Sequence, residues 1–155
     1  MGQMIFVAAA DAPATPGGYA LALRLDAPLD IRVGKIKATL PAGDYLYCGS
    51  ARGPGGLRAR LARHMRPHKR AHWHIDQLTA AASLLGAFVE EQGDECVLNA
   101  ALSDLPIPIA GFGSSDCRRC AAHLRLLPKG AALPSDWENA RKAAHLPLKR
   151  GGRAA

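Results

Sequence analysis

The segment 45–64 constrains the fold of this chain most, because it runs from an aromatic strand through a glycine-rich turn into a basic helix. It reads Tyr45-Leu-Tyr-Cys-Gly-Ser-Ala-Arg-Gly-Pro-Gly-Gly-Leu-Arg-Ala-Arg-Leu-Ala-Arg-His64. Leu57, Leu61 and Met65 repeat at helical spacing, which predicts that one side of this helix packs against a core. The segment therefore predicts a strand–turn–helix unit attached to a sheet.

Three kinds of phosphate-binding chemistry meet in this unit. The strand presents Tyr45, Tyr47 and Gly49 on one side, since side chains alternate along a strand. Arg60 and His64 lie four residues apart and share a helix face. A phenol, a guanidinium and an imidazole are thus expected around a turn where glycine lets a ligand approach the backbone.

The length and the apolar patterning indicate one globular domain. A chain of 155 residues can bury a sizeable core without disulfides. No apolar run approaches the roughly 18–20 residues of a membrane span, which predicts no membrane association. The apolar stretch 4–10 lacks a basic flank and predicts a strand, not a signal peptide. We therefore expect a cytoplasmic protein with reduced cysteines.

The net charge of +7 is concentrated in one part of the chain. Residues 45–75 contain seven Lys or Arg residues and no acid, so the remainder is close to neutral. A solvated basic face is the ordinary explanation, but a localised positive field also attracts polyanions. The segment predicts a nucleic-acid surface with these members: Ser50, Arg52, Arg58, Arg63, Arg66, Lys69, Arg70, His72, Trp73 and His74.

The pattern of elements predicts an α/β domain with a small mixed, largely antiparallel sheet flanked by helices. The early order of strand, turn, strand, turn, strand favours an antiparallel meander. Residues 1–130 are expected to form the main domain, and 131–155 a short helix and a basic, disordered tail. Strands are expected at 4–7, 19–25, 31–33, 44–48, 84–89 and 124–127, and helices at 55–66, 74–82 and 94–102, with a last helix starting at a Ser135–Glu138 capping box.

Two tyrosines are expected side by side on neighbouring strands. Tyr19 follows Gly18, and Tyr47 precedes Cys48 and Gly49. A phenol near a metal or an arginine can lose its proton more easily than in water and activate a nucleophile. The alternative is that both rings are half-buried strand residues with satisfied hydroxyls.

The combined motifs resemble the GIY-YIG nuclease superfamily. They are Gly18-Tyr19, the Tyr-Cys-Gly of 47–49, the basic helix 57–64 and an acid on a later helix. The segments 47–57, 72–76 and 112–117 resemble a little-characterised branch of that superfamily, and the resemblance covers about residues 17–127. It implies a GIY-YIG-like domain that hydrolyses phosphodiester bonds.

The resemblance also implies a role for each site residue. Tyr19 or Tyr47 would be the general base or orient the water. Arg60 would neutralise the scissile phosphate, and His64 would assist it or the leaving group. Glu95 would hold one Mg²⁺ or Mn²⁺, a cation that prefers oxygen ligands.

Glu95 has competitors and a simpler explanation. It shares a helix face with Leu98, which would direct it towards the core edge. An acid in the first turn of a helix is also favoured by the macrodipole alone. Glu90 and Glu91 are alternative ligands. Many superfamily members carry an asparagine beyond this glutamate, where the present chain has Asn99 nearby and Ile107 further on.

Two further motifs each have two interpretations. Cys117-x-x-Cys120-x-x-His123 has a spacing compatible with zinc, with Cys96, His72 or His74 as the fourth ligand. Ordinary reduced thiols are the alternative. In the segment 72–76, Trp73 would stack on a base, or instead pack in the core.

The function expected from these observations is a metal-dependent endonuclease acting on DNA rather than RNA. A repair-related role, with a repair enzyme as partner, is expected alongside it. The alternatives are a non-catalytic nucleic-acid-binding module and a zinc-stabilised accessory domain of a repair system.

Overall fold

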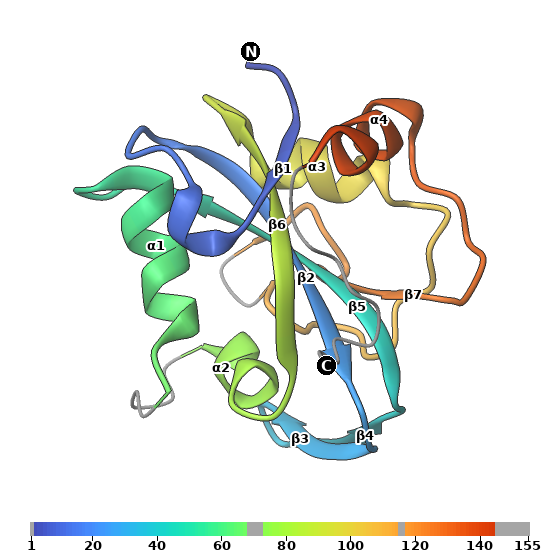
Figure 1. The fold of residues 1–155 in the computed structure, drawn as a ribbon. Coiled ribbons are helices and arrows are strands. Elements are labelled where there is room, and N and C mark those ends of the chain that lie inside the picture. Colours follow the sequence, from blue (N-terminus) through green and yellow to red (C-terminus); the bar gives the residue numbers. More distant parts are fainter. Residues whose placement is uncertain (1, 68–72, 115–116, 145–155) are drawn as a thin grey trace.

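The computed structural model describes residues 2–67, 73–114 and 117–144 (Figure 1). Lys69, Arg70, His72 and the predicted tail 145–155 lie outside these residues. Within them, no helix is long and apolar enough to cross a membrane. The elements, in chain order, are β1 (Ile5–Val7), η1 (Ala9–Asp11), β2 (Gly17–Leu25), β3 (Leu29–Val33), β4 (Ile36–Leu40), β5 (Gly43–Ala51), α1 (Gly56–Met65), α2 (His74–Thr79), β6 (Ser83–Glu91), α3 (Glu95–Ala101), β7 (Leu124–Leu127) and α4 (Ser135–Ala143).

The predicted α/β class is confirmed. Five strands form one sheet in the order β1-β6-β2-β5-β7, and every pairing described in it is antiparallel. The helices α1 and α2 lie on one side of this sheet, and α3 and α4 lie towards the other (Figure 1). The long central strands β2 and β5 pair along their whole length, so that Tyr19 lies directly opposite Gly49.

The predicted meander was wrong because a separate hairpin intervenes. β3 and β4 pair only with each other, and β5 returns to pair with β2. The hairpin turns at Gly34, whose φ of 61° suits a two-residue turn that joins Val33 to Ile36. β4 was missed because its residues are mostly exposed, with Ile36 at 61% exposure.

Both faces of the central sheet are buried. Tyr19 and Leu21 of β2 belong to one core, while Ala20 and Ala22 belong to a second core with Leu98 of α3. The alternation of large apolar residues with alanines along β2 predicts a half-buried strand, but the structure buries both of its faces. The two alanines are small enough for a helix to pack over them, so the second face is also excluded from water.

The helix α1 is fixed to the sheet more tightly than its apolar repeat suggested. Leu57, Leu61 and His64 are buried, whereas Met65 is 43% exposed. The predicted third apolar contact was therefore wrong, because the buried face ends at His64. The N–H of Leu57 donates to the carbonyl of Thr15 at 2.9 Å. The start of α1 is thus satisfied within the chain and does not form a phosphate cradle.

The C-terminal helix α4 packs on the sheet through Trp137, whose ring lies 4.9 Å from that of Phe88. Its predicted capping box was wrong: Pro134 is the N-cap, and Ser135 makes no capping hydrogen bond. Glu138 still accepts the backbone N–H of Leu133.

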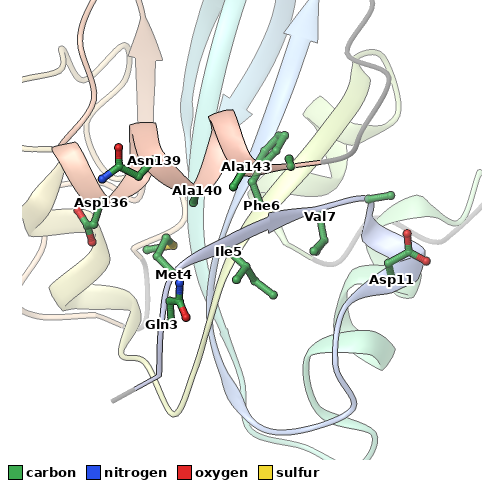
Figure 2. Close-up of a pocket in the computed structure, with 12 residues that line it drawn as sticks. Gln3, Met4, Ile5, Phe6, Val7, Asp11, Asp136, Asn139, Ala140 and Ala143 are labelled. Carbon is green, nitrogen blue, oxygen red and sulfur yellow. The ribbon is translucent and has the colours of Figure 1, made fainter.

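An open groove of about 650 Å³ separates α4 from the edge strand β1. Figure 2 shows Phe6 pointing towards α4 while Ile5 and Val7 point away, as the alternation of a strand requires. None of the predicted catalytic residues lines this groove.

Candidate functional site

A cavity of about 710 Å³ opens where β2, β5, α1 and α3 meet. It brings together residues that are far apart in the chain, from Tyr19 to His123. Four of the five predicted catalytic residues line it, namely Tyr19, Tyr47, Arg60 and Glu95. Because they come from four different elements, only the tertiary fold assembles them.

Tyr19 lines the cavity and contacts His64, the fifth predicted catalytic residue, which is buried and does not line it. The hydroxyl of Tyr19 and Nε2 of His64 share a hydrogen bond of 2.8 Å, and both side chains are almost fully buried. Gly49 lies opposite Tyr19, and a Cβ there would come within 2.4 Å of the Tyr19 hydroxyl oxygen. The glycine of the Tyr-Cys-Gly motif therefore makes room for the Tyr19 phenol.

We expect Gly49→Ala to displace the Tyr19 hydroxyl and break its hydrogen bond to His64. Overpacking of this kind costs about 1–3 kcal/mol of stability. The free energy of unfolding, measured with urea, should fall accordingly. Gly53→Ala is a matched control, because a Cβ at Gly53 meets nothing within 4 Å. Equal stability of the two variants would contradict this account of Gly49.

The second tyrosine approaches the same histidine from another strand. The Tyr47 and His64 ring centroids lie 6.3 Å apart, and those of Tyr19 and His64 lie 5.6 Å apart. The sequence predicted that an arginine would ease deprotonation of a phenol, and Arg60 does act in this direction on the pKa of Tyr19, but burial outweighs it. Burial raises the pKa of Tyr19 above its ordinary value, and nearby Arg60 only partly offsets it. Burial likewise raises the pKa of Tyr47.

Arg60 is held against the cavity wall by two contacts. Its Nη1 donates to the carbonyl of Ser50 at 2.8 Å. Its guanidinium also lies 4.8 Å from the ring centroid of Trp73, which is a cation–π contact. Trp73 is half-buried and packs against the core, so the structure favours the core reading of this residue.

Arg63 lies over the same Trp73 ring at 4.0 Å and forms a two-bond ion pair with buried Asp76. Asp76 also accepts the backbone N–H of Trp73 at 2.9 Å. Residues 73–76 of the His-Trp-His-Ile-Asp motif therefore build the start of α2 and fasten it to α1. α2 ends at Thr79, shorter than predicted.

Other predicted nucleic-acid ligands also have anchoring contacts. Arg52 donates to the carbonyl of Gly93, and Arg58 donates to that of Ala12. Both residues remain exposed, as does Arg66. Their role in binding nucleic acid stays a prediction.

Glu95 occupies the position that the sequence analysis assigned to the metal ligand. It begins α3, where the Asp94 side chain caps the helix by accepting the N–H of Val97. Its Oε1 accepts the hydroxyl of Ser50 at 2.6 Å, and its Oε2 lies 3.0 Å from Nδ1 of His123. The hydrogen bond from His123 lowers the pKa of Glu95, so the carboxylate is ionised at neutral pH. Glu90 and Glu91, the competitors, do not line the cavity.

Asn99 does not reach the cavity. It is buried, and its amide donates to the carbonyl of Ala122 at 2.9 Å. Its Oδ1 accepts Nε of Arg125, a buried arginine that sequence reasoning missed. Arg125 also donates to the carbonyl of Leu105. Its position within the apolar strand β7 carries no signal that would have indicated this role.

A cluster of three cysteines and a histidine borders the cavity. One ligand atom from each of the four residues lies within 4.8 Å of the others, and the members are Cys96, Cys117, Cys120 and His123. This cluster could hold a metal ion. Of the fourth ligands considered, the structure brings Cys96 to the site. His74 is used elsewhere, since its Nδ1 accepts the N–H of Gly113.

The sulfur geometry of the cluster suits a tetrahedral metal. The Sγ atoms of Cys96 and Cys117 are 3.6 Å apart. With zinc–sulfur distances of about 2.3 Å, the sulfurs of a tetrahedral site are about 3.8 Å apart. Nε2 of His123 is buried and has no hydrogen-bond partner among the described residues. The donor set and this unpaired nitrogen both fit a metal ligand role.

A protein-family model matches residues 18–146 of the chain. The family is described as a domain of unknown function, DUF123. The chain belongs to this family. The match includes β2 to α4, and therefore both the cavity and the Cys₃His cluster. Comparisons with curated proteins and with solved structures found no match.

Proposed function

We propose that this DUF123 protein is a divalent-metal-dependent endonuclease that hydrolyses phosphodiester bonds in DNA. The observation that carries the proposal is the convergence of Tyr19, Tyr47, Arg60 and Glu95 on one cavity. Phosphoryl transfer is catalysed mainly by positioning and by neutralisation of charge. The resemblance to GIY-YIG nucleases supports the same conclusion, and a repair enzyme as partner stays a prediction.

Arg60 would bind the scissile phosphate. A guanidinium has five N–H donors, and the Ser50 carbonyl accepts one of them. The Trp73 ring keeps the guanidinium plane in place, so less entropy is lost when a phosphate binds. Arg60 is therefore pre-oriented for a planar, two-bond contact with phosphate oxygens.

Glu95 would hold Mg²⁺ or Mn²⁺. Ser50 and His123 each occupy one lone-pair direction of the carboxylate, which has about four. The remaining directions and the open cavity suit a hard cation that keeps several waters. Such a metal supplies charge neutralisation and a more acidic bound water.

The Tyr19–His64 pair would remove the proton from the attacking water. Because burial keeps the phenol protonated, Tyr19 is not expected to act as a free phenolate. Its oxygen can accept a proton from water while its own proton moves to Nε2 of His64, across the 2.8 Å hydrogen bond. Tyr47 also lines the cavity and would orient the water.

Zinc is the metal we propose for the Cys₃His cluster. Three thiolates and one imidazole are typical of closed, structural zinc sites. Because all four ligands come from the protein, zinc would link the start of α3 to the segment that carries Cys117, Cys120 and His123, and would not take part in the reaction.

Glu95→Ala tests the proposed function. With Mg²⁺ or Mn²⁺ present, wild-type protein should cleave at least one of branched, single-stranded, abasic or duplex DNA, and chelator should stop it. The Glu95→Ala rate should be at least about 10²-fold lower, while binding is retained. The zinc content of each preparation is measured in parallel, and Glu90→Ala is the matched control because it lies outside the cavity.

The same experiment separates the alternatives. DNA binding without cleavage by the wild type would favour a non-catalytic module. Absence of salt-sensitive binding would contradict both proposals, since phosphate contacts weaken as salt rises. Cleavage of the matching RNA and not of DNA would overturn the preference for DNA.

A further inference from the structure

His123 connects the substrate cavity to the Cys₃His cluster. Its ring is 1% exposed, and the two nitrogens have different surroundings. Nδ1 lies 3.0 Å from Oε2 of Glu95, where its N–H donates to the carboxylate. Nε2 is buried without a hydrogen-bond partner among the described residues, and the ring belongs to the cluster with three sulfurs. One ring therefore faces a carboxylate on one side and thiols on the other.

Glu95 is placed between the two sites by its own contacts. It is half-buried at the start of α3, directly before the cluster residue Cys96. Ser50 of β5 holds its Oε1 at 2.6 Å, which leaves Oε2 directed at His123. The carboxylate thus lines the substrate cavity and also holds a residue of the cluster.

We propose that Glu95 orients His123 on the zinc of the Cys₃His cluster, so that the zinc site and the catalytic carboxylate share one hydrogen bond. A carboxylate that accepts the second N–H of a metal-bound histidine fixes its tautomer and raises its basicity as a ligand. The bound His123 in turn holds Glu95 at the cavity wall. This proposal deepens the proposed function, because it rests on the zinc assigned to the cluster there.

The affinity for zinc is the direct test. Removing such an orienting carboxylate weakens metal binding about 10- to 100-fold. Competition with a chromophoric zinc chelator should show this loss for Glu95→Ala. Glu95→Gln should lose less, since its amide oxygen can still accept from Nδ1. Glu90→Ala is the matched control and should stay close to wild type, because it leaves the contact between Glu95 and His123 in place.

Nitrogen NMR of the zinc-loaded wild type provides a readout that does not depend on a variant folding. His123 should carry its proton on Nδ1 and bind the metal through Nε2. A proton on Nε2, or a zinc affinity in Glu95→Ala equal to that of wild type, would overturn the proposal. Neither measurement requires cleavage, so a protein that binds zinc in this way but cuts no DNA would fail the proposed function alone.

Discussion

Arg60→Ala is expected to lower the rate of DNA cleavage by about 10²- to 10³-fold, the usual cost of removing one donor that neutralises transition-state charge. Arg60 is the guanidinium that the Ser50 carbonyl and the Trp73 ring hold in the cavity wall. Single-turnover kinetics with Mg²⁺ and saturating protein would measure the loss. The slope of log binding constant against log salt should also fall by about one, because one phosphate contact is lost.

Two further variants test whether the loss of rate is specific to the guanidinium of Arg60. Arg60→Lys keeps the charge but loses the planar fork, so its rate should fall between those of wild type and Arg60→Ala. Arg32→Ala removes an exposed arginine of β3, outside the cavity, and should cleave at the wild-type rate. If Arg60→Ala cleaved as fast as Arg32→Ala, the phosphate-binding role of Arg60 would be wrong.

Four residues of the cavity could be named from the sequence, partly from local patterns and partly from the resemblance to GIY-YIG nucleases. Tyr47 and Arg60 belong to one strand–turn–helix segment, and Glu95 follows an N-cap aspartate. Periodicity and capping determine which face of an element such residues occupy. Tyr19 was expected near Tyr47 because their two strands were expected to be neighbours in the sheet. The pairing of β2 with β5 confirmed this.

The protonation state of the site could not be predicted in this way. Burial dominates the pKa of Tyr19, and the groups that bury it come from distant segments. His64 was expected to lie beside an apolar stripe, yet it replaces Met65 as the last buried residue of α1. The hairpin β3–β4 was incompletely predicted because its second strand has little apolar character. Such features depend on tertiary contacts, which no local pattern contains.

The fourth ligand of the Cys₃His cluster could not be predicted from a local pattern either. A short, regular spacing indicates three of the ligands, namely Cys117, Cys120 and His123. Cys96 lies 21 residues before Cys117, so no such spacing indicates it. Cys96, His72 and His74 were equivalent candidates in the sequence. The choice of Cys96 follows from the packing of α3, whose first turn carries both Glu95 and Cys96 to the cavity.

Removal of zinc is expected to lower the melting temperature by roughly 10 °C. A ligand present at about a thousandfold excess over its Kd stabilises the folded state by about 4 kcal/mol. For a domain of this size, each kcal/mol changes Tm by about 2–4 °C. Differential scanning calorimetry of the zinc-loaded protein, with and without a zinc chelator, would measure the shift.

Two cysteine variants show whether the Cys₃His cluster causes this shift. Cys117→Ala removes one ligand, so its Tm should be low and should not respond to chelator. Cys48→Ala is the matched control, because Cys48 is buried in the second core and lies outside the cluster. Burial also raises the pKa of the Cys48 thiol, which keeps it protonated and unsuited to bind metal. A chelator shift in Cys117→Ala as large as in Cys48→Ala would place the metal elsewhere and contradict the assignment of zinc to this cluster.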